Sequence, residues 1–205
     1  MLAQQIASPV LVELFTCQFC SSCPPADALL AGSDPAILAL DMHVTYWNGP
    51  AWRDRFSFSA ATERQRAYAR LFGLDSICTP QLVAGGRFQA VGSDTSAVHA
   101  AIAAAGADAT PGPTLRLAAH GTALHLDLGA GTGAGRLFLV GFDPAHGGEN
   151  AGRVLREVDI VRSLAVVGAW TGAPLRLDLP APSGRRAAAF LQAPDGRISA
   201  VAVLP

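Results

Sequence analysis

The fold is decided by residues 10–27, which read VLVELFTCQFCSSCPPAD. A nearly continuous apolar run over 10–16 predicts a central strand that is buried on both faces. Two prolines and an alanine-rich segment follow, and together they indicate the start of a helix. Three cysteines, Cys17, Cys20 and Cys23, therefore lie in the turn between a strand and a helix. Because the positive end of a helix dipole favours a thiolate, this arrangement predicts sulfur chemistry.

Composition narrows the classes of protein to which the chain can belong. It has 205 residues, half of them hydrophobic, and a formal net charge of −1. This length allows one large or two small domains with a sizeable core. Because no basic stripe stands out, we expect no nucleic-acid partner and no electrostatic attraction to a membrane. The chain contains no lysine, which excludes a lysine Schiff base. No apolar run reaches about 18 residues, so we expect no transmembrane segment.

The first nine residues, MLAQQIASP, lack the basic and apolar regions of a signal peptide. We therefore expect a cytoplasmic protein, unless an upstream signal is missing from this sequence. In that case the protein is periplasmic or secreted. Four cysteines in a chain of this length are too few for a disulfide scaffold.

The chain falls into two parts with different patterns. Over residues 8–106, helix and strand patterns predict an α/β domain. Its helices are expected at 59–71 and from a cap at Asp94 or Ser96 through residue 105, and its strands at 10–16, 37–44, 81–84 and 87–91. Residues 107–113, rich in Pro and Gly, predict a linker. Beyond it, residues 114–205 predict a β-sandwich, because seven short apolar runs alternate with turns at 115–117, 123–128, 136–142, 154–167, 175–179, 186–192 and 198–204. The run at 154–167 is also compatible with a partly helical segment.

Several residues outside the cysteine turn are candidates for the site. Glu13 interrupts the first apolar run, either as a carboxylate paired with an arginine or as a buried acid that shuttles protons for the thiols. His43 is expected to be a hydrogen-bonded structural residue rather than a catalytic one. With Thr79, it is also a candidate to face the substrate. Trp47 lies in an aromatic loop that we expect to cap the core, with a substrate-facing position as the alternative. The pair Thr79-Pro80, before a short strand, is compatible with a cis proline that positions a loop near the thiols.

These motifs resemble a known family in addition to the general thioredoxin-like pattern of a thiol pair and a facing Thr-Pro. The matching segments are ELFTCQFCSSCPPAD (13–27), HVTYW (43–47), WRD (52–54), ERQRAY (63–68), TPQ (79–81) and GENAGR (148–153). Together they are similar to the signature of the domain of unknown function 1223 family. The resemblance implies a thioredoxin-like domain with a β-rich C-terminal extension, often exported in bacteria, and it implies no settled activity.

The sequence departs from that family pattern at two cysteines. The family usually has serine at the position of Cys17 and a non-cysteine, often tyrosine, at that of Cys78. In a thioredoxin-like fold both positions border the active site. The departures therefore suggest a second disulfide, Cys17–Cys78, or a site with four thiols.

Three chemistries remain open from the sequence. In the first, a thiol–disulfide oxidoreductase, Cys20 attacks, Cys23 resolves, and Pro80 holds the opposing loop. Its partners are protein or small-molecule thiols and disulfides with an unknown electron donor, and no cofactor is expected. In the second, Cys17, Cys20, Cys23 and Cys78 bind a metal ion or an iron–sulfur cluster. In the third, the thiols form structural disulfides in a non-enzymatic envelope protein that binds a partner.

Overall fold

A computed structural model describes residues 8–31, 34, 36–144, 146–150, 153–157 and 159–204, with the backbone alone at 146–150 and 153–157. The three helices in this part of the chain are α1 (Pro24–Leu30), α2 (Ser59–Phe72) and α3 (Thr95–Ala107). The strands are β1 (Val10–Thr16), β2 (Ile37–His43), β3 (Gln81–Ala84), β4 (Phe88–Val91), β5 (Leu115–His120), β6 (Ala123–Leu128), β7 (Gly135–Asp143), β8 (His146–Asn150), β9 (Arg153–Glu157), β10 (Ile160–Trp170), β11 (Leu175–Pro180), β12 (Arg186–Gln192) and β13 (Ile198–Val203).

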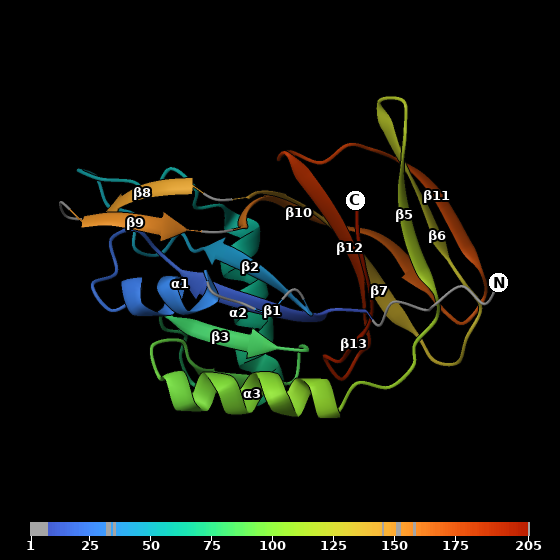
Figure 1. Cartoon of the computed structure of the whole chain (residues 1–205), viewed down its shortest axis with the longest axis horizontal. Coiled ribbons are helices and arrows are strands. Elements are labelled where there is room, and N and C mark those ends of the chain that lie inside the picture. Colours follow the sequence, from blue (N-terminus) through green and yellow to red (C-terminus); the bar gives the residue numbers. More distant parts are fainter. Residues whose placement is uncertain are drawn as a thin grey trace.

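An eight-stranded mixed sheet, in the order β13-β12-β7-β10-β2-β1-β3-β4, forms the centre of the molecule (Figure 1). Strand β1 lies between parallel β2 and antiparallel β3. It is buried along almost its whole length, which agrees with the apolar run at 10–16. The thiol turn therefore leaves the end of a strand that is fixed on both sides.

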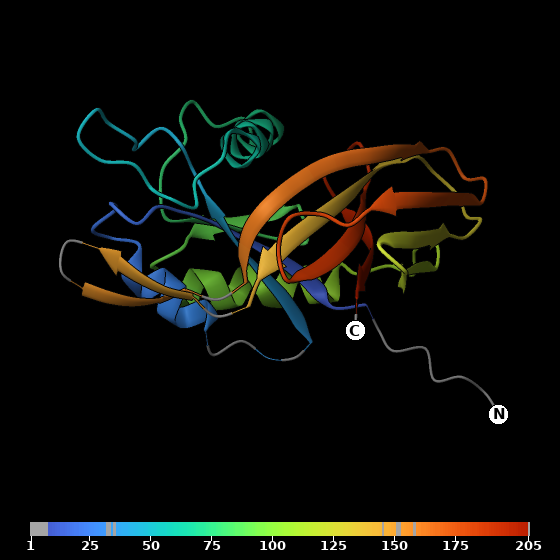
Figure 2. The same cartoon turned by 90° about the horizontal axis from the view of Figure 1, so that it is seen from above.

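Helices cover both faces of the N-terminal half of this sheet. Helices α1 and α3 pack on one face through Ala26, Leu30, Val98 and Ala101, and α2 lies on the opposite face (Figure 2). The side chain of Asp94 caps α3 by accepting a hydrogen bond of 3.0 Å from the Ala97 amide. Helix α2 ends at a left-handed glycine, so the predicted helix at 59–71 is confirmed within one residue.

The C-terminal half adds a second, three-stranded sheet in the order β11-β6-β5. Strand β6 alternates between buried and partly exposed residues, and its buried leucines pack against β7 and β12. Two packed sheets were expected here, but the larger one does not belong to the C-terminal half alone. Strand β10 pairs with β2 through Ile160 and Asp41, so one sheet runs through both halves of the chain. Apolar runs reveal strands but not their partners, and the sequence therefore missed this continuity.

The segment at 154–167, which was compatible with strand or helix, contributes to two strands. Strand β9 pairs with β8 in a separate hairpin, and β10 pairs with β7. Register shifts between Val161 and Ser163, and again between Val166 and Gly168, interrupt the β10 ladder. Each bulge reverses the alternation of side chains, which explains why the period of this segment is ambiguous in the sequence. The GENAGR motif lies partly outside the described residues.

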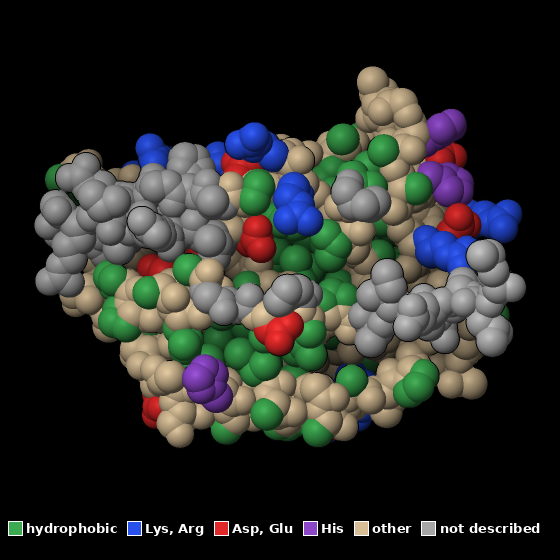
Figure 3. Space-filling view, viewed as in Figure 1, with side chains coloured by type: hydrophobic (Ala, Val, Ile, Leu, Met, Phe, Trp, Pro, Cys, Tyr) green, Lys and Arg blue, Asp and Glu red, His purple; other side chains and the backbone are tan. Residues whose placement is uncertain are grey.

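Charged side chains are interspersed on the face that carries α1 and α3 (Figure 3). Arginine and acidic side chains lie next to each other there, with apolar side chains between them. In the described part of the chain, no helix is long and apolar enough to cross a membrane.

Candidate functional site

The thiol turn consists of two successive hydrogen-bonded turns between β1 and α1. The amide of Cys20 donates to the Cys17 carbonyl at 3.1 Å, and the amide of Cys23 donates to the Cys20 carbonyl at 3.3 Å. Cys23 is the N-cap of α1, and Pro24 and Pro25 occupy the first helical turn, where their missing N–H groups leave no bond unmade. The sequence thereby brings Cys20 and Cys23 together at the start of the helix.

Cys20 has the environment of a reactive thiol. Its Sγ lies 3.6 Å from the Thr79 carbonyl oxygen and 3.7 Å from the Ser22 hydroxyl. The largest influence on the pKa of Cys20 is a hydrogen bond from the Cys23 thiol. Together with side-chain hydrogen bonds of Thr79 and Ser22 it lowers this pKa to about 5, although burial acts in the opposite direction. Above that pH Cys20 is a thiolate, the nucleophilic form of cysteine. The residue is only 4% exposed, so a partner must fit closely to reach it.

Cys23 is the complementary, protonated member of the pair. Its hydrogen bond to Cys20 and its burial raise the pKa of the Cys23 thiol well above the ordinary value. The Thr16 hydroxyl contacts this thiol and donates a hydrogen bond of 3.0 Å to the buried Asp27 carboxylate. A carboxyl group is thus connected to Cys23 through one hydroxyl.

The other two cysteines have different surroundings. Cys17 is buried and accepts a hydrogen bond from the Phe19 amide at 3.2 Å, and burial raises its pKa to about 12. Cys78 is exposed, and all four cysteines are free thiols. Over the described residues, no three His, Cys, Asp or Glu side chains converge as metal ligands would. The Cys17–Cys78 disulfide stays a prediction, and no observation favours the four-thiolate site.

The loop before β3 lies beside Cys20 and is held from several sides. The Thr79–Pro80 peptide bond is cis, as the sequence suggested. Gln65 of α2 donates to the Cys78 carbonyl at 2.7 Å, and the Trp47 indole donates to the Thr79 hydroxyl at 2.8 Å. Gly92 lies so close that an added Cβ would approach Pro80 within 2.9 Å. This position therefore requires glycine.

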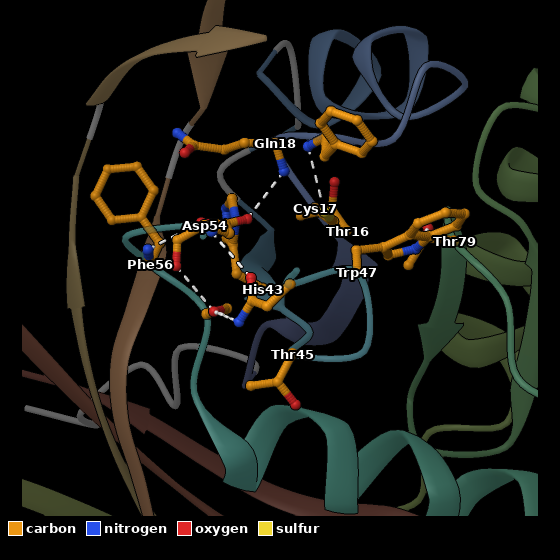
Figure 4. Close-up of polar contacts among 12 residues, drawn as sticks. Thr16, Cys17, Gln18, His43, Thr45, Trp47, Asp54, Phe56 and Thr79 are labelled. Carbon is orange, nitrogen blue, oxygen red and sulfur yellow. Dashed lines mark hydrogen bonds and ion pairs between the residues drawn. The ribbon is translucent and has the colours of Figure 1, made fainter. Parts of the chain in front are cut away.

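A buried histidine–aspartate pair, His43 and Asp54, supports the thiol turn. Nδ1 of His43 lies 2.8 Å from Oδ2 of Asp54, and the same carboxylate accepts hydrogen bonds of 2.9 Å from the amides of Gln18 and Phe56 (Figure 4). Burial alone would raise the pKa of Asp54, but the bonds to His43 and the two amides hold it below its usual value. His43 is fully buried, so it supports the turn and does not face a substrate.

Aromatic side chains lie next to the thiol turn and the Thr79 loop. Trp47 is 44% exposed, so within the aromatic loop it takes the alternative, outward-facing position and does not cap the core. Tyr46 and Trp52 pack against the core instead, and the ring of the exposed Phe19 contacts Trp52 at 5.3 Å between centroids. Trp47 is positioned by its bond to Thr79 and not by core packing. We call Phe19, Trp47 and Trp52 the aromatic rim.

Glu13 is buried in the centre of the sheet and pairs with α2. Arg64 binds both oxygens of its carboxylate, with 2.8 Å from Nη2 to Oε2, and the Tyr68 hydroxyl donates to Oε2 at 2.5 Å. Burial alone would lower the pKa of Arg64, but the Glu13 carboxylate raises it above its ordinary value. The arginine-paired interpretation of Glu13 is therefore the one that the structure supports.

Three residues of the site were not found from the sequence: Thr16, Asp27 and Asp54. The spacing of Asp27, four residues after Cys23 on a helix, gave a usable signal, because residues i and i+4 share a helix face. Thr16 and Asp54 gave none, since their roles depend on contacts made only in the folded chain.

The fold and the site together define a mixed α/β protein with a large central sheet and a thiol pair at the end of a central strand. The sequence pattern described as protein of unknown function (DUF1223) matches residues 11–192. The chain therefore belongs to the DUF1223 family, which confirms the resemblance found from the sequence.

Two solved structures are similar to this one. The crystal structure of protein AGR_C_4864 from Agrobacterium tumefaciens is 29% identical and has a TM-score of 0.82, with 97% of this chain and 93% of that chain covered. HBP35 of Porphyromonas gingivalis is 12% identical, with a TM-score of 0.61 over 95% of this chain and 74% of that chain, and supports the fold alone. No curated protein sequence matches the chain.

Proposed function

We propose that this protein is a thiol–disulfide oxidoreductase built on a thioredoxin-like scaffold. One observation carries the proposal: Cys20 and Cys23 form a hydrogen-bonded pair in which the pKa of Cys20 falls to about 5 while that of Cys23 rises. An attacking thiol must be ionised near ambient pH, whereas a resolving thiol must stay protonated until its turn. The pKa values of the two cysteines therefore differ in the direction that attack by Cys20 and resolution by Cys23 require.

The arrangement of the N-terminal elements supports the thioredoxin-like scaffold. The thiol pair lies between β1 and α1, β2 runs parallel to β1, and β3 and β4 complete the sheet as an antiparallel pair. Thr79 and Pro80 precede β3 and bring a carbonyl oxygen within 3.6 Å of the Cys20 sulfur. The proposed attacking thiol therefore faces a loop against which a substrate backbone can lie.

The exchange reaction proceeds in two balanced steps. The Cys20 thiolate attacks one sulfur of a substrate disulfide, so that a mixed disulfide forms and the other substrate sulfur leaves as a thiolate. Cys23 then loses its proton towards Asp27 through the Thr16 hydroxyl and attacks the Cys20 sulfur. The Cys20–Cys23 disulfide forms, the second substrate thiol leaves, and two electrons have passed to the substrate. The same steps in reverse oxidise a dithiol.

The aromatic rim gives the substrate a place to bind. Phe19 and Trp47 are both exposed beside Cys20, while Cys20 itself is almost covered. Aromatic side chains contribute large contact areas at low entropic cost, so a peptide segment with apolar side chains fits this rim. A protein disulfide is therefore the proposed substrate class.

We expect a reversible Cys20–Cys23 disulfide and a thiolate that titrates near pH 5. In a Cys78→Ser background, which removes the exposed thiol, the rate of alkylation at Cys20 should rise between pH 4 and 6 and then level off, because the thiolate is the reactive form. Peptide mapping by mass spectrometry, before and after oxidation, locates the disulfide. Alkylation of Cys20 that begins only near pH 8 would contradict the proposal.

A pair of substitutions at Cys23 tests the origin of the low pKa. Cys23→Ala removes the hydrogen-bond donor, so the alkylation midpoint of Cys20 should move up towards the ordinary thiol value, about 8.5. Cys23→Ser keeps a donor at the same place and should leave the midpoint well below that of Cys23→Ala. Equal midpoints in the two variants would show that another group stabilises the thiolate.

A further inference from the structure

A cavity lies on the α2 side of the sheet. Its volume is about 780 Å³, and its walls come from α2, from β7 and β10, and from the turn after β12. In this half of the molecule the three-stranded sheet covers only the other face of the large sheet. None of Cys20, Cys23 and Thr79 lines this α2–β10 cavity, so it is separate from the thiol site. Its size falls within the range of small-molecule pockets, roughly 300–1,000 Å³.

Much of the wall is apolar and open to solvent. Leu71 of α2 and Val166 of β10 are 42% and 52% exposed, and both line the cavity. Phe138, Leu164 and several alanines complete the apolar surface. Removing such surface from water is favourable, so the ligand that fits this wall has an apolar chain or ring as its main part.

The charges on the wall favour an anion. Arg70 and Arg136 line the cavity, and neither has an ion pair among the described residues. The guanidinium of Arg136 lies 5.5 Å from the centroid of the Phe138 ring, which holds it against the wall. Glu63 is the one acidic residue of the lining, and Arg64 is already neutralised by Glu13. The lining thus carries an excess of one positive charge, whereas the whole chain carries −1.

From these observations we propose that the α2–β10 cavity binds an amphiphilic monocarboxylate, such as a medium-chain fatty acid. The apolar chain covers Leu71, Val166 and Phe138. The carboxylate lies between Arg70 and Arg136. This site is independent of the thiol chemistry proposed above.

Calorimetric titration of the reduced, full-length protein with decanoate, below the aggregation concentration of decanoate, tests this proposal. Decanol, which has the same alkyl chain without the charge, is the matched control. We expect saturable 1:1 binding of decanoate and at least tenfold weaker binding of decanol. Arg136→Gln and Arg70→Gln should each weaken decanoate binding about tenfold and leave decanol binding unchanged. Val166→Asp, at an exposed position, should weaken both ligands.

Two further variants keep the result interpretable. Arg116→Gln removes an exposed arginine on β5, outside the cavity, and should change neither affinity. Leu71→Asp, on the exposed cavity wall of α2, should weaken both ligands. Circular dichroism checks that each variant is folded. Absence of saturable decanoate binding, equal affinity for decanol, or an equal loss in Arg116→Gln and Arg136→Gln would overturn the proposal.

Discussion

Cys20→Ser is expected to abolish the reduction of a protein disulfide such as insulin, with a loss on the order of 10³-fold or more in rate. A serine hydroxyl does not ionise at neutral pH and cannot form the mixed disulfide, so no alternative nucleophile replaces the thiolate. The other three thiols do not provide one, because Cys17 and Cys23 are buried with raised pKa values and Cys78 lies outside the hydrogen-bonded pair. The measurement is the turnover rate with dithiothreitol as electron donor.

Matched serine substitutions at the other cysteines separate the chemistry from a general loss of structure. Cys78→Ser changes an exposed residue and should keep nearly full activity. Cys23→Ser should stop turnover after the first step, and the intact mass should then show the substrate covalently attached to Cys20. Full activity in the Cys20→Ser variant would refute the oxidoreductase assignment. That outcome would leave the decanoate site untouched, because the two sites share no residue.

Local patterns in the sequence were sufficient for most of the individual elements. The apolar run at 10–16, the helix between Ser59 and the glycine at position 73, and the short strands of the C-terminal half all appear at or near their predicted positions. These patterns depend on contacts within one element, such as alternating burial or a C-terminal glycine. The thiol turn was predictable for the same reason, since Cys20, Cys23 and the prolines are neighbours in the chain.

Pairing between distant segments could not be predicted in this way. The contact of β10 with β2 joins Ile160 to Asp41, and nothing in either run specifies the other as its partner. The orientation of Trp47 could not be predicted for a related reason. Trp47 is oriented by a hydrogen bond to Thr79, 32 residues away, and a count of aromatic residues cannot reveal that contact. The hydrogen bond by which Asp54 supports the thiol turn could likewise not be predicted from the sequence, because it joins two loops that are far apart in the chain.

Glu13→Gln is expected to cause the largest loss of stability of any single substitution at the core of the sheet, about 3–5 kcal/mol. The substitution leaves the Arg64 guanidinium buried without its counter-charge, and Arg64 is stacked on the rings of Tyr68, Phe138 and Phe190, where water cannot replace the carboxylate. Urea unfolding followed by circular dichroism gives the change in the free energy of unfolding.

A double substitution distinguishes the loss of a charge pair from the loss of packing. Glu13→Leu with Arg64→Met removes both charges and keeps apolar volume in the centre of the sheet, so most of the lost stability should return. Tyr68 then loses the carboxylate that accepts its hydrogen bond. Gln192, which is hydrogen-bonded to both Arg64 and Tyr68, still donates to the Tyr68 hydroxyl. A double variant as unstable as Glu13→Gln would mean that the buried pair contributes through specific geometry and not through charge balance.

The same variants decide whether Glu13 takes part in proton transfer. Among the described residues, every hydrogen bond to its carboxylate comes from Arg64 and Tyr68, whereas Asp27 is connected to Cys23 through Thr16. We therefore expect Glu13→Gln to leave the pH dependence of Cys20 alkylation unchanged while Asp27→Asn slows the release of the mixed disulfide. A shifted alkylation profile in Glu13→Gln would restore Glu13 as the acid beneath the thiols. An unchanged profile assigns it to the framework that holds β1, and with it the thiol turn, in place.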